Sequence, residues 1–219
     1  MTRTGGGGPP SDPGMLAPPT RFRYSGNVLI DRARWRAQLP ALVLGLSVLS
    51  ACKSRTPEAT FESVTTALQN DDAEALFETL ALDTRWSWMT IQRYQRESYD
   101  IVMSNYPQGV DRETQLRRLE VGAVAQSAAE LYANSEGKNQ LVALKKVWPQ
   151  STKWSRKTDE ASTPDREGNP LVFRLNEGRW GLTKFGEAAD LLKKRAASDI
   201  DIIKTNATDF ERAARRGQP

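Results

Sequence analysis

The residue types that carry out most enzyme chemistry are scarce in this chain. It contains one cysteine, Cys52, and no histidine among its 219 residues. Without histidine, the chain has no Ser-His-Asp or Cys-His pair, no histidine-ligated metal and no general base with an ordinary pKa near neutral pH. Catalysis would depend on carboxylates, lysine or tyrosine, and no spacing of these residues marks a catalytic set. We therefore expect a non-enzymatic protein with no catalytic residues, no metal and no cofactor.

Cys52 stands at the end of a segment that has the parts of a secretory signal in order. Three arginines lie within residues 32–36, a mostly apolar run covers residues 41–49, and small residues precede the cysteine. The sequence Leu49-Ser50-Ala51-Cys52 resembles the lipobox of bacterial lipoproteins. The resemblance implies signal cleavage between Ala51 and Cys52 and a lipid on the Cys52 sulfur. It also implies an acyl chain such as palmitate on the new amino group.

Two other interpretations of residues 41–52 stay open, a membrane-spanning helix and a buried helix of a cytoplasmic protein. A spanning helix needs about 20 apolar residues, roughly twice the length of this run. Charged residues flank the run on both sides, which is unfavourable for burial. The lipoprotein resemblance places the protein in the bacterial cell envelope, attached to a membrane through its lipid anchor. Lys53 follows the cysteine where an aspartate would favour the inner membrane, so the outer membrane, facing the periplasm, is expected.

These features divide the chain into five segments. Residues 1–27 are rich in glycine and proline, which predicts a disordered extension or a translation start assigned too early. The other segments are a signal peptide over 28–51, a lipidated tether over 52–57, an α+β domain over 58–185 and a C-terminal helix over 186–216.

The net charge of the chain comes from the segment that we expect to be removed. The whole chain has a formal charge of +4, and residues 1–51 contain six arginines and two aspartates, which account for all of it. The remaining residues carry equal numbers of basic and acidic side chains. Nucleic-acid binding needs a concentrated positive field, so we expect no nucleic-acid partner.

Apolar residues at helical spacing predict four helices in the first part of the domain. They are expected from Pro57, after the turn Asn70-Asp71-Asp72, from Asp83 or Thr84 to Pro107, and over 111–133, where Gly122 is expected to kink or divide the helix. A loop is expected over 134–137.

The pattern beyond residue 137 predicts strands and then one more helix. Residues 141–148 and 151–157 are strand candidates with weak signals. Residues 171–175 and 179–185 flank a turn with glycine at position 178, which predicts a β-hairpin. Helical spacing resumes from Glu187 to about Arg215.

Two of these motifs resemble NTF2-like domains. One is the pair of short helices around Asn70-Asp71-Asp72, and the other is the final hairpin that ends in Arg179-Trp180-Gly181-Leu182. The resemblance implies an α+β fold in which N-terminal helices pack on a C-terminal antiparallel sheet. The long C-terminal helix departs from that pattern, because NTF2-like domains end near their last strand.

The C-terminal helix carries a narrow apolar stripe whose members alternate between spacings of four and three residues. The stripe consists of Ala196, Ile200, Ile203, Ala207, Phe210 and Ala214. Docking of this stripe on the chain's own domain is the first interpretation. In the second interpretation, Ile200, Ile203, Ala207 and Phe210 form a candidate face for a protein partner.

Two further clusters have a structural and a functional interpretation. Four aromatic residues near the third helix are expected in the core, or else around a cavity for an apolar ligand: Trp86, Trp88, Tyr94 and Tyr99. Asp71, Asp72 and Glu74 fit a helix cap better than a cation site, because no calcium-loop spacing accompanies them. Lys193-Lys194-Arg195 is expected to be a solvated helix face rather than a contact with anionic headgroups.

The sequence thus favours a membrane-anchored envelope lipoprotein that acts as a non-enzymatic protein-interaction or structural module. The alternative is a binder or carrier of an apolar ligand, such as a phospholipid, in an NTF2-like cavity. An interaction module predicts a packed interior and an exposed apolar patch of some hundreds of Å². A carrier predicts an internal apolar cavity.

Overall fold

The structure of the protein is a computed structural model that describes residues 56–217. The expected extension, signal peptide and lipobox, with the cleavage site at Ala51 and the lipid attachment at Cys52, lie outside the described residues. The helices are α1 (Pro57–Gln69), α2 (Ala73–Glu78), α3 (Leu82–Asn105), α4 (Val110–Val124), α5 (Ala128–Tyr132), the π-helix η1 (Ala133–Gly137), α6 (Lys138–Val147) and α7 (Gly186–Arg216). The strands are β1 (Ser155–Arg156), β2 (Glu160–Pro164), β3 (Pro170–Asn176) and β4 (Arg179–Leu182).

Local capping explains the first two helices. The Thr56 hydroxyl accepts a hydrogen bond from the Ala59 N–H at 3.2 Å, and Pro57 occupies the first helical position, where its missing N–H costs nothing. The Asp72 carboxylate accepts from the Ala75 N–H at 2.9 Å and caps α2. The predicted helix, turn and helix are confirmed.

The strands form one antiparallel meander in the order β1-β2-β3-β4. The predicted hairpin is confirmed, with Phe173 opposite Leu182 and Asn176 opposite Arg179. Its turn residues Glu177 and Gly178 both have positive φ, 51° and 75°, which fits the right-handed twist of a two-residue hairpin.

The edge of β4 pairs with the link between α2 and α3. The Leu182 N–H donates to the Thr79 carbonyl, and the Ala81 N–H donates to the Leu182 carbonyl, both at 2.9 Å. Because of this pairing, the chain between the two helices continues the sheet by one short parallel bridge between Leu80 and Leu182. The sheet and the helical layer are therefore joined by backbone as well as by side chains.

The main core lies where α1, α2, α5 and α6 meet the sheet and the first turns of α3 and α7. Phe61 of α1 stacks on Trp148, with ring centroids 4.5 Å apart, and Trp154 packs edge-on against Phe173 at 5.4 Å. The α+β class, with helices followed by an antiparallel sheet and a long C-terminal helix, is confirmed. The described residues are mostly helical.

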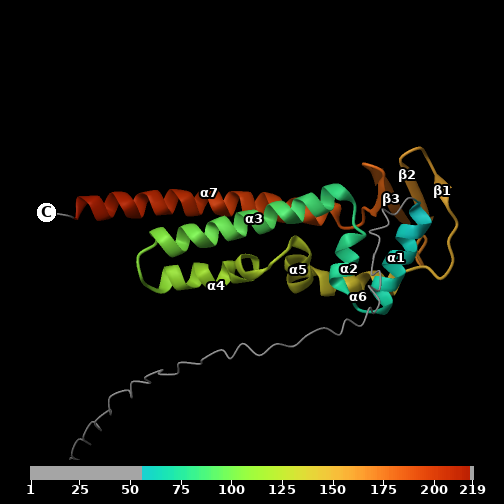
Figure 1. Cartoon of the computed structure of the whole chain (residues 1–219), viewed down its shortest axis with the longest axis horizontal. Helices are drawn as coiled ribbons and strands as arrows, with labels where there is room; N and C mark the ends of the chain where they lie inside the picture. Colours follow the sequence, from blue (N-terminus) through green and yellow to red (C-terminus); the bar gives the residue numbers. More distant parts are fainter. Residues whose placement is uncertain (1–55, 218–219) are drawn as a thin grey trace, which may run out of the picture. The chain divides into compact units, whose positions relative to one another are not determined.

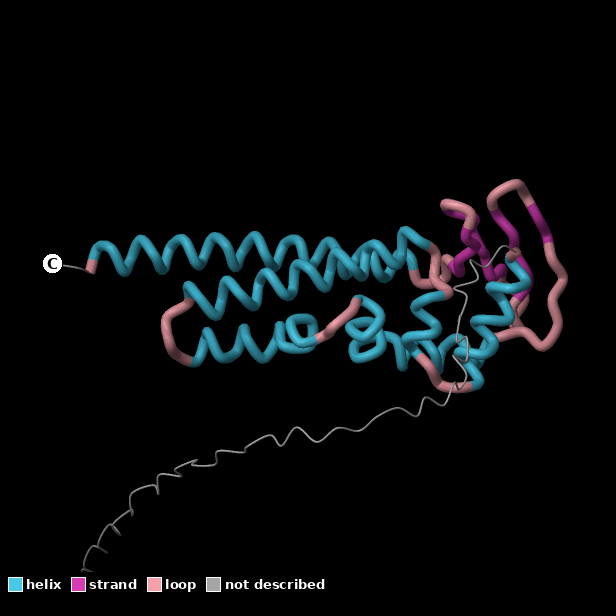
Figure 2. The backbone as a smooth tube through the Cα atoms, in the orientation of Figure 1, coloured by secondary structure: helices cyan, strands magenta, loops and turns pink. Residues whose placement is uncertain are grey.

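Helices α3, α4 and α7 form a three-helix bundle that continues beyond the sheet (Figures 1 and 2). Helices α3 and α7 run parallel, because hydrogen bonds and ion pairs join Ser87 to Asp190, Glu97 to Lys204 and Asn105 to Glu211 in the same order along both. Helix α4 returns antiparallel to α3. A second core, called the distal core here, fills the far end of the bundle and consists of Val102, Tyr106, Leu119, Ile203 and Ala207.

Three predictions about elements are wrong. Residues 141–148 are not a strand but lie mostly in α6, where Leu141, Leu144 and Trp148 are buried at helical spacing. Of residues 151–157, only Ser155–Arg156 form a strand. The segment 134–137 belongs to η1 and is not a loop.

The predicted helical stretch over 111–133 is divided into α4 and α5, but the break follows Val124, two residues beyond Gly122, which lies inside α4. The helix ends at Val124 because Gln92 and Arg96 of α3 donate to the carbonyl of Ala125, at 2.9 and 2.7 Å. Ser127 then caps α5 through the Glu130 N–H. These tertiary hydrogen bonds hold the chain out of the helix where local sequence alone favours its continuation. Likewise, α3 begins at Leu82, one residue ahead of the predicted caps, and no side chain caps it.

Among residues 56–217, no helix combines the length and the apolar character that crossing a membrane requires.

Candidate functional site

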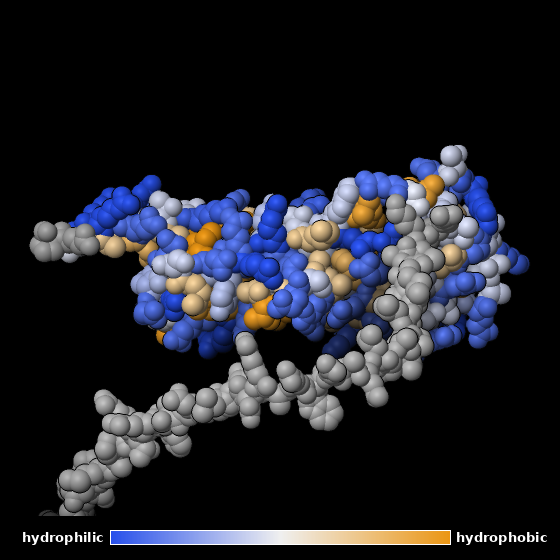
Figure 3. Space-filling model, in the orientation of Figure 1, coloured by the Kyte–Doolittle hydropathy of each residue, from blue (hydrophilic) through white to orange (hydrophobic). Residues whose placement is uncertain are grey.

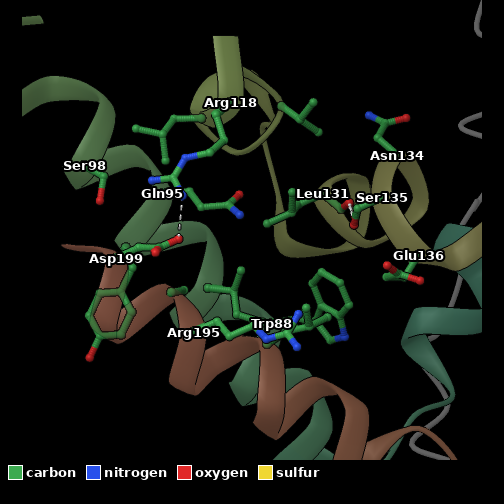
Figure 4. A pocket seen from close by; sticks show the side chains of 16 residues that line it. Trp88, Gln95, Ser98, Arg118, Leu131, Asn134, Ser135, Glu136, Arg195 and Asp199 are labelled. Carbon is green, nitrogen blue, oxygen red and sulfur yellow. Dashed lines mark hydrogen bonds and ion pairs between the residues drawn. The ribbon is translucent and has the colours of Figure 1, made fainter. Parts of the chain in front are cut away.

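A pocket of about 350 Å³ opens between α3, α4, the α5–η1 segment and α7 (Figure 4). Its apolar lining consists of Trp88, Ile91, Tyr94, Leu119, Val121, Leu131, Leu192 and Ala196. Polar and charged side chains complete the wall: Gln95, Ser98, Arg118, Asn134, Ser135, Glu136, Arg195 and Asp199. No strand residue lines the pocket. Its volume lies at the small end of the range of about 300–1,000 Å³ that small-molecule sites occupy.

The pocket lies between the main core and the distal core because the buried face of α3 changes character there. This face follows the spacing of a coiled-coil seam, with Trp88 and Ile91 at one end of the pocket lining and Val102 beyond the other end. Gln95 and Ser98 occupy the intervening positions. A small hydroxyl and an amide fill less apolar volume than the leucine or isoleucine usual at such positions, so the helices enclose a space there.

Gly122 brings α4 close to α3 beside the pocket. A Cβ atom at this position would lie 1.9 Å from the Gln95 side-chain oxygen and 2.6 Å from the Gln95 Cβ. Both separations are far inside van der Waals contact. Only glycine therefore permits this approach, which sets the width of the pocket at the α3–α4 wall.

One ion pair joins the α4 and α7 walls. The guanidinium of Arg118 lies 3.0 Å from the carboxylate of Asp199, and both side chains are nearly half exposed. Exposed pairs of this kind contribute about 0–1 kcal/mol to stability. The pair contributes little to the fold, and it neutralises two of the charges at the pocket.

The opposite wall is the π-helix η1, which carries Asn134, Ser135 and Glu136 (Figure 4). The Ser135 hydroxyl donates to the Leu131 carbonyl at 2.6 Å. The last residue of η1 is Gly137, where a Cβ would lie 2.9 Å from both the Tyr132 ring and the Ala73 Cβ. This position therefore requires a residue without a side chain. Short π-helical segments interrupt α-helices mostly at functional sites.

Tyr132 supports the floor of the pocket from behind. It is fully buried, packs edge-on against Trp88 with ring centroids 5.3 Å apart, and donates its hydroxyl proton to the Gln140 side chain at 2.9 Å. Burial, together with the nearby carboxylate of Glu136, raises the pKa of Tyr132 well above its ordinary value. The phenol therefore stays neutral, and its role is structural.

Hydrogen-bond donors without acceptors gather at the pocket. The Trp88 indole N–H is buried, and no residue within 56–217 accepts from it. Arg195 forms no ion pair or side-chain hydrogen bond with any described residue, whereas its neighbour Lys193 pairs with Asp190 at 2.7 Å. The Trp88 indole nitrogen has almost no accessible surface, so a ligand in the pocket would meet the ring of Trp88 and not its N–H.

The structure separates the four aromatic residues that the sequence grouped. Trp88 and Tyr94 line the pocket, Tyr99 packs beside the distal core, and Trp86 is 52% exposed. The prediction that the group belongs to the core is confirmed for Trp88, which is buried, and is wrong for Trp86.

The apolar stripe of α7 packs inside the chain, as the docking interpretation describes. Ala196, Ile200, Ile203 and Ala207 are buried, and Phe210 packs edge-on against Tyr106 with ring centroids 4.9 Å apart. The stripe ends there, because Ala214 is exposed. The residues proposed as a partner face are thus largely covered by α3 and α4.

Two acidic residues between α1 and α2, Asp71 and Asp72, form structural contacts. Asp72 caps α2, and Asp71 pairs with Lys145 of α6. In the part of the chain that the structure describes, no three carboxylate, cysteine or histidine side chains come close enough to hold a metal ion.

The sequence carries one signal for the pocket. Gln95 and Ser98 are polar residues between the apolar residues Ile91 and Val102, at the spacing of the inward-facing positions of α3. Arg118, Glu136 and Arg195 gave no such signal, because only the packing of three helices brings them to one pocket.

No protein-family model, curated protein or solved structure matches the chain.

Proposed function

We propose that the protein is a lipid-anchored lipoprotein of the bacterial envelope and that its interhelical pocket binds a small apolar ligand without catalysis. The observation that carries the ligand-binding part is the pocket itself, with an apolar lining that includes Trp88, Ile91 and Leu131. The lipid anchor is proposed from the Leu49-Ser50-Ala51-Cys52 motif, and the outer membrane facing the periplasm from the residue that follows it.

A ligand binder is preferred here to a protein-interaction module for two reasons. The apolar stripe of α7 is buried, so it presents no continuous face to a partner. On the side of the molecule seen in Figure 3, apolar areas form separate small patches among hydrophilic side chains. The exposed large apolar side chains are spread over four helices, for example Met103 on α3, Val124 on α4, Val142 on α6 and Ile202 on α7.

The pocket makes this proposal independent of the NTF2-like resemblance. An NTF2-like ligand would lie against the concave sheet, whereas this pocket is lined by helices alone. The volume favours a single short acyl chain or a fused aromatic ring system over a phospholipid with two chains. We retain an NTF2-like relationship only for the arrangement of α1, α2 and the final hairpin.

Ligand binding is tested with N-phenyl-1-naphthylamine, a neutral probe whose fluorescence rises in apolar surroundings. The unlipidated full chain carrying Cys52→Ser is expected to bind this probe saturably at one site. Ala196→Phe places a ring in the pocket and should weaken binding at least tenfold. Ala197→Phe, a neighbour on the same helix that does not line the pocket, is the matched control.

Two outcomes would contradict the proposal. One is the absence of saturable binding by the parent chain. The other is an equal effect of the two alanine substitutions. If Ala196→Phe lowers the unfolding temperature strongly, Ser98→Leu fills the same pocket from α3 and replaces it as the test.

A further inference from the structure

We infer that the ligand of the interhelical pocket is an amphiphile with one oxyanion group, such as a carboxylate or sulfonate, held by Arg195. This inference rests on the proposed ligand-binding function and adds the chemical class of the ligand. The apolar body would lie on Trp88 and Ile91, and the acidic group would lie at the α7 wall.

The first argument is that the guanidinium of Arg195 has no anionic partner. Arg195 lines the pocket and is exposed, and within the described residues no carboxylate lies within ion-pair distance of it. A guanidinium only donates hydrogen bonds. A ligand oxyanion with several lone pairs satisfies such a donor, while a pure hydrocarbon leaves it unused.

The second argument concerns the other cations in the pocket and next to Arg195. Each of them either forms an ion pair or does not line the pocket. Arg118 is tied to Asp199 at 3.0 Å, and Lys193 is tied to Asp190 at 2.7 Å. Lys194 and Arg195 are both exposed, but only Arg195 lines the pocket. Arg195 is therefore the cation that the α7 wall can offer. A guanidinium also binds an oxyanion through two parallel N–H groups, which fixes the orientation of the ligand.

The negative charge of Glu136 repels an anionic group, and this limits the number of acidic groups that the ligand can carry. It lines the pocket from η1, and among residues 56–217 it forms no ion pair. Figure 4 shows Glu136 on the η1 wall, on a different side of the pocket from Arg195. A ligand with a single acidic group at the α7 end meets the guanidinium directly, whereas a ligand with acidic groups at both ends would approach the Glu136 carboxylate. The charges thus select one acidic group rather than two.

The test compares two probes that share one ring skeleton. 1-Anilinonaphthalene-8-sulfonate carries a sulfonate that N-phenyl-1-naphthylamine lacks. Dissociation constants are measured for both probes with the full chain carrying Cys52→Ser. Arg195→Gln is expected to weaken binding of the sulfonate about tenfold or more, since hydrogen bonds to charged groups are strong. Binding of the neutral probe should change less than twofold.

Two further variants separate a specific contact from a general charge effect. Lys194→Gln removes the same charge from the adjacent position and should leave both dissociation constants unchanged. Glu136→Gln removes the opposing carboxylate and should tighten binding of the sulfonate while leaving the neutral probe unaffected.

The results distinguish failure of this inference from failure of the proposed function. If neither probe binds saturably, or if Ala196→Phe has no effect, the ligand-binding function itself is refuted. If the neutral probe binds in the pocket but Arg195→Gln and Lys194→Gln affect the sulfonate equally, or not at all, only the inference about the acidic group is overturned.

Discussion

Gly181 is the position where a single methyl group should damage the fold most. A Cβ at this position would lie 2.5 Å from the Ala81 Cα and 2.7 Å from both the Ala81 nitrogen and the Leu80 carbonyl oxygen. All three are backbone atoms, so no side-chain rotation relieves the overlap. In Gly181→Ala, strand β4 has to move away from the link between α2 and α3.

The magnitude follows from what this movement breaks. Overpacking in a well-packed region costs about 1–3 kcal/mol. The two hydrogen bonds that Leu182 forms with Thr79 and Ala81 each contribute about 0.5–1.5 kcal/mol. We therefore expect Gly181→Ala to lower the free energy of unfolding by about 3–5 kcal/mol, a large share of the 5–15 kcal/mol typical of a domain.

Urea unfolding followed by circular dichroism measures this change. Gly217→Ala is the matched control, because a Cβ there meets its nearest atom at 3.7 Å, an ordinary contact, at the end of α7. The control should change the free energy of unfolding by less than about 0.5 kcal/mol. A loss below about 1 kcal/mol for Gly181→Ala would refute the close approach of β4 to residues 80–81.

Three other changes test the remaining parts of the structure. Gly122→Ala should push α4 away from Gln95 and lower the free energy of unfolding by about 1–3 kcal/mol, measured by urea unfolding; stability equal to the parent would show that the two helices are not so close. Asp165 accepts hydrogen bonds from the Glu167 and Asn169 N–H groups, both at 2.9 Å. Burial raises the pKa of Asp165, but these two donors and the nearby Lys184 lower it by more, so the pKa lies below 3.8. A lowered pKa stabilises the folded state above pH 3.8, and this contribution is lost as the pH falls through the pKa of the folded state. Asp165→Asn should therefore lower the free energy of unfolding by about 1–3 kcal/mol at pH 7 and by much less at pH 2.5. An equal loss at both pH values would contradict this prediction. Cys52→Ala should abolish signal processing and lipid attachment in a bacterial host, seen by a mass shift of the precursor and by membrane fractionation, and unchanged processing would exclude the lipoprotein interpretation.

The sequence predicted best those elements whose signals are local. The Glu177-Gly178 turn and its flanking strands, the Asp72 cap and the stripe of α7 each depend on residues within one or two turns of each other, and the structure has all of them. The spacing of Leu141, Leu144 and Trp148 is helical as well, and it is a local signal for α6 that the weak strand prediction over 141–148 leaves out.

The elements that were predicted wrongly depend on contacts between distant residues. Nothing near Val124 in the sequence ends α4; the hydrogen bonds that end it come from Gln92 and Arg96, about thirty positions earlier in the chain. Gly122 resembles a helix breaker in isolation, yet it lies inside α4 because Gln95 occupies the space of its missing side chain. Local propensity is a weak guide where tertiary contacts decide the outcome.

The pocket lies where the inward face of α3 carries polar side chains. Gln95 and Ser98 occupy seam positions of α3 where larger apolar side chains would bury more surface, at about 25 cal/mol for each Å². Ser98 is 1% exposed, so its hydroxyl occupies a position where an apolar side chain would stabilise the fold. The pocket therefore costs stability along a bundle whose two ends are well packed by the main and distal cores. The chain thus keeps polar residues on the inward face of α3 and a π-helix in the facing wall. It gives up stability at this one place, and a ligand that covered the apolar lining would recover part of that stability.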